Sequence, residues 1–126
     1  MSRTLKVMVF EPGKDGEVRE IPDTLTALQQ IVGGYIENVY VHPNLTHVMG
    51  RCTDERIVVA VSPAKKGLVW IVNEEGLLKG LPPNRWVKDA AGNELALLGP
   101  ILLARYTASG DNANLLPADV AAFKDW

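Results

Sequence analysis

The run LVWIV at residues 68–72 decides the fold, because five apolar residues in succession leave neither face of a strand polar. Successive side chains of a strand point to opposite faces, so such a strand must be covered on both sides. The run IVVAV at residues 57–61 has the same character. Cover can come from helices, from closure of the sheet into a small barrel, or from a second subunit, so the question of a homo-oligomer stays open.

Toward the N-terminus, residues 5–10 predict another strand that is apolar on both faces. Turn-forming residues follow at 12–16, and residues 17–21 predict the returning strand of a hairpin, with Val18 and Glu20 on one side. The chain therefore begins with an antiparallel pair.

Residues 25–32 carry apolar side chains at helical spacing, between Asp23 as a candidate N-cap and a glycine pair that favours a helix end. The aromatic and β-branched segment 35–41 predicts the next strand. Near the C-terminus, residues 101–106 predict a late strand. Pro117 suits the first turn of a closing helix, with Val120, Phe123 and Trp126 pointing inward.

The order of these elements predicts an α+β fold with a largely antiparallel mixed sheet and two short helices. At 126 residues the chain is long enough for one domain with its own core, so a single α+β domain over residues 1–126 is expected. The composition, 47% hydrophobic and 22% charged, is ordinary for a globular protein.

Charge and cysteine content exclude several classes of function. The formal net charge of −2 provides no basic field for a nucleic acid backbone. No apolar run is long enough for a signal peptide core or a membrane span, so a cytoplasmic protein without a membrane partner is expected. The single cysteine, Cys52, excludes an internal disulfide and fits a reducing compartment.

Metal and thiol chemistry have few candidate residues. His42, His47 and Cys52 are separated by intervals of five, which is unusual for zinc, and no fourth ligand pairs with them, so no metal site and no cofactor are expected. Arg51 favours the thiolate of its neighbour Cys52, although a buried, unreactive thiol is the more common outcome. No catalytic residue is therefore assigned.

The segment NEEGLLKGLPPNR at residues 73–85 is the candidate ligand site. Tandem prolines stiffen the backbone before the amide and the guanidinium, which predicts that both side chains are held outward. A guanidinium suits carboxylate or phosphate, and a neighbouring indole can stack on a planar ligand. The predicted ligand-binding residues are Glu74, Glu75, Lys79, Asn84, Arg85 and Trp86. The alternative is a structural loop in which Arg85 pairs with Glu74 or Glu75.

Four segments carry a resemblance to a known family: residues 6–13, LTALQQIVGGYIE at 25–37, the segment 73–85 and residues 98–101. Together they resemble the domain of unknown function 3846 family of small proteins from phages and mobile elements. IVGGYIE and GLPPNR are the most specific parts of the match. The resemblance implies a context but no reaction, cofactor or catalytic residue: small accessory proteins of phages often bind a host factor or a host signalling molecule.

The leading hypothesis is a non-enzymatic phage or mobile-element accessory protein that binds a small anionic or nucleotide-like ligand, such as a host defence signal. A rival is an inhibitor that covers a host protein with an exposed apolar or strand-edge surface. A second rival is a thiol-dependent enzyme that uses Cys52.

Overall fold

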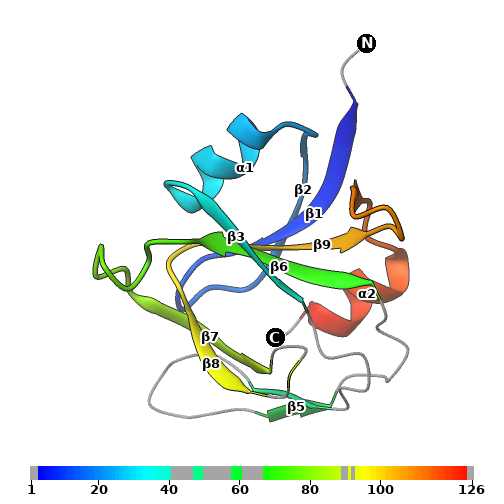
Figure 1. Ribbon diagram of the computed structural model, residues 1–126. Coiled ribbons are helices and arrows are strands. Elements are labelled where there is room, and N and C mark those ends of the chain that lie inside the picture. The colour runs from blue at the N-terminus through cyan, green and yellow to red at the C-terminus, as the bar shows by residue number, and fades with distance from the viewer. Residues whose placement is uncertain are drawn as a thin grey trace.

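The computed structural model describes residues 3–40, 47–49, 58–60, 67–88, 91 and 93–124 (Figure 1). Its strands are β1 (Thr4–Phe10), β2 (Glu17–Pro22), β3 (Ile36–Tyr40), β4 (His47–Met49), β5 (Val58–Ala60), β6 (Leu68–Asn73), β7 (Pro83–Lys88), β8 (Glu94–Leu98), β9 (Ile101–Tyr106) and β10 (Asn112–Ala113). The helices are α1 (Leu25–Val32) and α2 (Pro117–Phe123). The main sheet has the order β2-β1-β9-β6-β3, with β10 on β9, while β4 pairs with β5 and β7 with β8.

The predicted α+β fold with a largely antiparallel sheet is confirmed, since every strand pairing among the described residues is antiparallel. The strands predicted at 5–10, 17–21, 68–72 and 101–106 are present. The strand predicted at 57–61 is seen as β5 in its described part. His42, Cys52 and Trp126 lie outside the described residues.

The central strands β1, β6 and β9 are buried on both faces, as the apolar runs predicted. One face contributes Met8, Phe10, Trp70 and Leu103 to a core that also contains Val87, Leu97 and Phe123. The other face contributes Leu5, Val7, Ile71 and Leu102 to a second core with Leu28 and Val32. The alternation of side chains therefore supplies both cores from the same three strands.

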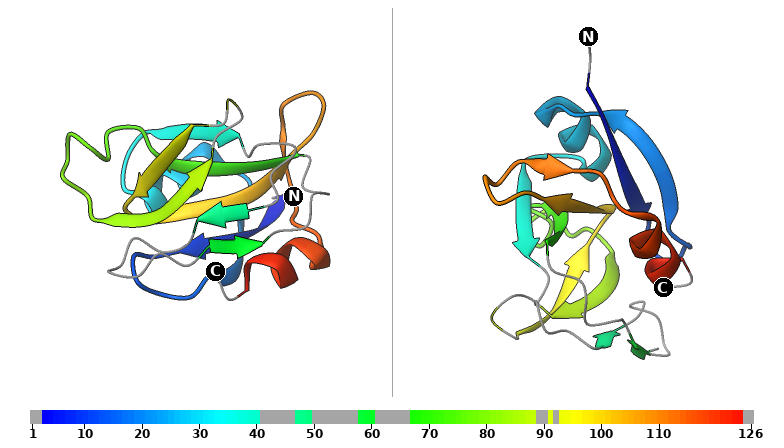
Figure 2. Two further views of the ribbon diagram at one scale, coloured as in Figure 1. Left: turned by 90° about the horizontal axis from the view of Figure 1, so that it is seen from below. Right: turned by 90° about the vertical axis from the view of Figure 1, so that its right-hand side faces the viewer.

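The cover comes from within the chain (Figures 1 and 2). Helix α1 lies on one face of the main sheet, where Leu28 and Val32 are buried. The β7–β8 hairpin and α2 lie against the other face, where Val87, Leu97 and Phe123 are buried. Of the three sources of cover left open by the sequence, the structure uses helices together with a second antiparallel hairpin.

The N-cap of α1 lies one residue later in the sequence than predicted. Thr24, not Asp23, is the N-cap: its side chain accepts a hydrogen bond from the backbone N of Ala27 at 3.1 Å. Asp23 instead pairs with Arg3 at 3.3 Å, which takes its carboxylate away from the helix end. The C-terminal end is as predicted, because Gly33 has a φ of 82° that favours glycine.

Candidate functional site

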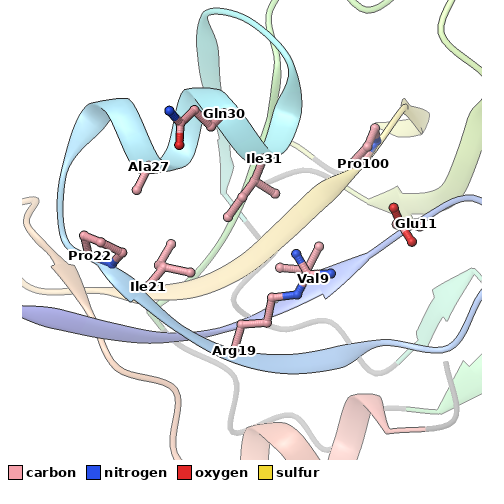
Figure 3. A pocket seen from close by; sticks show the side chains of 9 residues that line it. All are labelled: Val9, Glu11, Arg19, Ile21, Pro22, Ala27, Gln30, Ile31 and Pro100. Carbon is pink, nitrogen blue, oxygen red and sulfur yellow. The ribbon is translucent and has the colours of Figure 1, made fainter.

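A cleft of about 380 Å³ lies between α1 and the β1–β2 hairpin (Figure 3). Its wall is aliphatic and is formed by Val9, Ile21, Pro22, Ala27, Ile31 and Pro100. Three polar side chains, Glu11, Arg19 and Gln30, complete the lining. An apolar wall with a few polar groups is the usual composition of a small-molecule site, and the volume lies within the usual range for one.

Helix α1 is short relative to the width of the main sheet. Eight residues of helix extend about 12 Å, whereas five neighbouring strands extend about 19 Å from the first axis to the last. Helix α1 packs over β6, β9 and β3, and the cleft lies between the helix and the β1–β2 hairpin beside them. The helix presents Ala27 and Ile31, one turn apart, toward the gap (Figure 3).

Strand pairing places Arg19 on the cleft side of β2. Arg19 lies opposite Val7 and Ile21 lies opposite Leu5, and both of these β1 residues belong to the core under α1. Because directly paired residues share a face, Arg19 and Ile21 point to the same side. Val18, on the other side of β2, is 40% exposed.

Arg19 keeps one nitrogen available for a ligand. Its Nε and Nη2 donate to the carboxylate of Glu17 at 3.1 and 3.5 Å, whereas Nη1 donates to no group among the described residues. The Arg19 side chain is 38% exposed. An exposed ion pair of this kind contributes about 0–1 kcal/mol, so Glu17 is a weak competitor for an incoming anion.

Glu11 is the acidic group at the cleft rim. Its Oε2 lies 3.4 Å from the Nζ of Lys14, and both side chains are largely exposed, at 47% and 72%. The cleft therefore presents a guanidinium, a carboxylate and the amide of Gln30 around an aliphatic floor.

The predicted ligand residues Asn84 and Arg85 do not face outward, and that part of the prediction is wrong. Their exposed fractions are 1% and 0%. The strand β7 carries a bulge between Pro83 and Arg85, so Asn84 has no directly opposed residue on β8. Because a bulge breaks the alternation of side chains, two successive polar residues can both be turned into the protein.

Both side chains donate hydrogen bonds to carbonyl groups inside the protein. The Nδ2 of Asn84 donates to Phe10 O at 2.8 Å and to Gly99 O at 2.7 Å. The Nη1 of Arg85 donates to the Asn84 Oδ1 at 2.7 Å, and its Nη2 donates to Lys14 O. The guanidinium also lies over the Phe10 ring, with Cζ 5.2 Å from the ring centroid. In this conformation neither side chain can contact an external ligand.

The other four predicted residues are dispersed. The Lys79 Nζ donates to Gly33 O at 3.4 Å at the end of α1, and Trp86 is half-buried opposite Ala96 in the β7–β8 hairpin. Glu74 is exposed and lines a smaller groove of about 130 Å³, while Glu75 is half-buried in the turn beside it. None of the six predicted residues lines the cleft beside Arg19.

Sequence reasoning missed Arg19, Glu11 and Gln30. The signal for Arg19 was its alternation with Ile21, which places both on the face of β2 opposite Val18. Groups of three or more candidate metal ligands do not occur among the residues that the structure describes. Neither α1 nor α2 has the length of a bilayer-spanning helix, and the described part of the chain contains no other candidate.

The comparisons with known proteins define a family. No curated protein and no solved structure matches the chain. A family model does match, over residues 5–58 and 47–126, which together include almost all of the sequence. The chain therefore belongs to the family described as Domain of unknown function (DUF3846).

Proposed function

We propose that the protein binds a small organic anion with an apolar body in the cleft between α1 and the β1–β2 hairpin, without catalysing a reaction. The observation that carries this proposal is the position of Arg19, whose Nη1 remains available beside an aliphatic wall. A guanidinium offers a planar set of donors that matches carboxylate and phosphate. Hydrogen bonds to charged groups contribute about 1.5–3 kcal/mol, which is enough to select an anion.

The wall of the cleft favours an aliphatic ligand over a nucleotide. Among the residues that the structure describes, no aromatic side chain lines it. Trp86, which was expected to stack on a base, belongs to the β7–β8 hairpin on the other face of the sheet. An aliphatic ligand would bury its methylene groups against branched side chains such as Ile21 and Ile31. Each methylene group removed from water contributes about 0.8 kcal/mol to binding. The polar groups of the lining are a guanidinium, a carboxylate and an amide, which can donate and accept hydrogen bonds to the polar end of a ligand.

Titration of ¹⁵N-labelled protein with hexanoate tests the proposal, with the neutral analogue hexanol and the nucleotide AMP as comparison probes. We expect hexanoate to shift the amide signals of Ile21, Ala27 and Ile31, and hexanol to bind at least about tenfold more weakly, since the charged hydrogen bond is lost. AMP should bind more weakly than hexanoate. Tighter binding of AMP would favour the nucleotide-like ligand instead.

Arg19→Gln is the informative variant, and Arg3→Gln is its matched control. Arg3 is also an exposed arginine with an acidic partner, Asp23, but it does not line the cleft. We expect the Arg19 variant to weaken hexanoate binding about tenfold or more and the Arg3 variant to leave it unchanged. Equal affinities for the two variants, or shifts confined to other parts of the chain, would overturn the proposal.

A second function, recognition of a host protein, is favoured by one exposed surface. Leu77 and Leu78 are 84% and 87% exposed at a turn next to Tyr35, which is itself 64% exposed. A contiguous exposed apolar patch often marks a site of protein interaction. We expect a polypeptide in fixed stoichiometry with the wild-type chain purified from its native cells, and its loss from a Leu77→Ser, Leu78→Ser variant. Retention by that variant would exclude this surface.

A further inference from the structure

We propose that Asn84 and Arg85 are positioning residues of the cleft, acting from the opposite face of the sheet. They hold the backbone segments that carry two cleft residues, Glu11 and Pro100. This inference rests on the proposed function of the cleft. Asn84 and Arg85, which the sequence predicted to bind the ligand directly, would then act on the cleft without contacting the ligand.

The Asn84 amide joins two segments that are distant in sequence. Its Nδ2 donates to Phe10 O at 2.8 Å and to Gly99 O at 2.7 Å. Each of these carbonyl groups belongs to the residue immediately before a cleft residue, since Glu11 follows Phe10 and Pro100 follows Gly99. One amide group therefore sets the separation between two parts of the cleft rim. The backbone N of Gly99 reinforces this by donating to Pro82 O at 2.7 Å.

Arg85 holds the turn between β1 and β2. Its Nη1 lies 3.5 Å from Glu11 O, and its Nη2 donates to Lys14 O, so the guanidinium bridges the first and last residues of a short turn. The same Nη1 donates to the Asn84 Oδ1 at 2.7 Å, which fixes the orientation of the amide. Glu11 and its partner Lys14 are therefore anchored through their backbone carbonyl groups, while the Glu11 side chain remains at the rim.

Burial makes this arrangement rigid. Arg85 is 0% exposed and Asn84 is 1% exposed, and a buried charged or polar group is costly unless its donors are met. Moving either carbonyl segment would break hydrogen bonds that water cannot replace there. The rim geometry and the hydrogen bonds of the pair are thus coupled, and the coupling acts in both directions.

The wild-type protein provides the first test. Hexanoate added to the ¹⁵N-labelled chain should shift the Asn84 side-chain amide and the Arg85 guanidinium signals, although both lie across the sheet from the cleft. The NMR signals of the Arg105 guanidinium, which pairs with Asp119 of α2 elsewhere on the sheet, should not shift. Binding of hexanoate in the cleft with no change at Asn84 or Arg85 would overturn the inference and leave the proposed function intact.

Two lysine variants provide the second test. Arg85→Lys and Arg105→Lys each reduce the number of hydrogen-bond donors at a structural arginine. Arg85 contacts the cleft rim at Glu11 O, whereas Arg105 pairs with Asp119 on α2. We expect Arg85→Lys to weaken hexanoate binding about fivefold or more, and Arg105→Lys to change it less than about twofold, at matched losses of stability measured by urea unfolding. Equal effects on affinity would show a general response to destabilisation.

A third measurement separates this inference from the proposed function. Without any ligand, Arg85→Lys should displace the backbone amide signals of Glu11 and Ile101 more than Arg105→Lys does, because the rim segments lose an anchor. If hexanoate does not bind the wild-type chain, the proposed function fails while this comparison still tests the positioning role. Should Arg85→Lys not fold, Asn84→Ser takes its place in the same comparison.

Discussion

Arg105 on β9 and Asp119 on α2 form a two-pronged ion pair, with Nε to Oδ2 at 2.6 Å and Nη2 to Oδ1 at 2.8 Å. The Asp119 Oδ2 also accepts from the backbone N of Leu116 at 2.8 Å, so the same carboxylate caps the helix and ties it to the sheet. Asp119 is 0% exposed, which makes its partner essential. Besides this pair, Phe123 holds the short α2 in the core, and Val120 and Ala122 pack against the same core.

Removing one partner of this pair should be strongly destabilising. We expect Arg105→Ala to lower the free energy of unfolding by about 3–5 kcal/mol, because it leaves a buried carboxylate without its cation. Urea unfolding followed by circular dichroism measures the change. The double variant Arg105→Met, Asp119→Leu should recover much of the loss. A single variant as stable as the wild type would show that water reaches Asp119.

The contribution of the pair should not change with pH across the alkaline range. The hydrogen bonds that Arg105 donates to Asp119 raise the pKa of Arg105 above its usual range; burial opposes this shift, and the negative charge of Asp119 adds to it. A group whose pKa is higher in the folded state than in the unfolded state stabilises the fold fully at any pH below its unfolded-state pKa. This stabilisation is lost only as the pH rises through the folded-state pKa. The difference in unfolding free energy between wild type and Arg105→Ala should therefore be constant from about pH 7 to pH 10. A decline in this range would contradict the assignment.

The fold was largely predictable because its central strands are apolar on both faces. The runs at 5–10, 68–72 and 101–106 need only neighbouring residues to be recognised. The strand β7 was not predicted, since Pro82, Pro83 and the two polar residues that follow hide its alternation. The N-cap was off by one residue because Asp23 and Thr24 are both good caps, and a tertiary contact with Arg3 decides between them.

The candidate site was less predictable, for a different physical reason. Asn84 and Arg85 look like ligand-binding residues, but most of their acceptors are backbone carbonyl groups, which every residue type carries. Two of these carbonyl groups, those of Phe10 and Glu11, are 74 residues away in sequence. A sequence therefore gives no sign that these donors are already met. The cleft depends on where α1 packs relative to the β1–β2 hairpin, which is a property of the assembled fold.

Gly99 is a position where a side chain should be poorly tolerated, and Gly110 is its matched control. Both have positive φ, of 72° and 90°, so Gly→Ala introduces backbone strain of about 1–2 kcal/mol at either position. At Gly99 a Cβ would also lie 2.8 Å from the Leu81 Cδ1, whereas at Gly110 nothing lies within 4 Å. We expect Gly99→Ala to cost about 1–3 kcal/mol more than Gly110→Ala in urea unfolding. Equal costs would mean that Leu81 moves aside freely.

Asn73 should contribute more to stability than its size suggests, because it links the end of α1 to the turn after β6. Its Nδ2 donates to Val32 O at 3.0 Å, its Oδ1 accepts from the Glu75 N at 2.8 Å, and it is 6% exposed. We expect Asn73→Ala to lower the unfolding free energy by about 1–3 kcal/mol and to speed amide exchange in the last turn of α1. Asn114→Ala is the control, since Asn114 also accepts a 2.8 Å bond, from Lys6 N, but at an exposed site. If the exposed asparagine proved equally important, burial would not be the source of the effect.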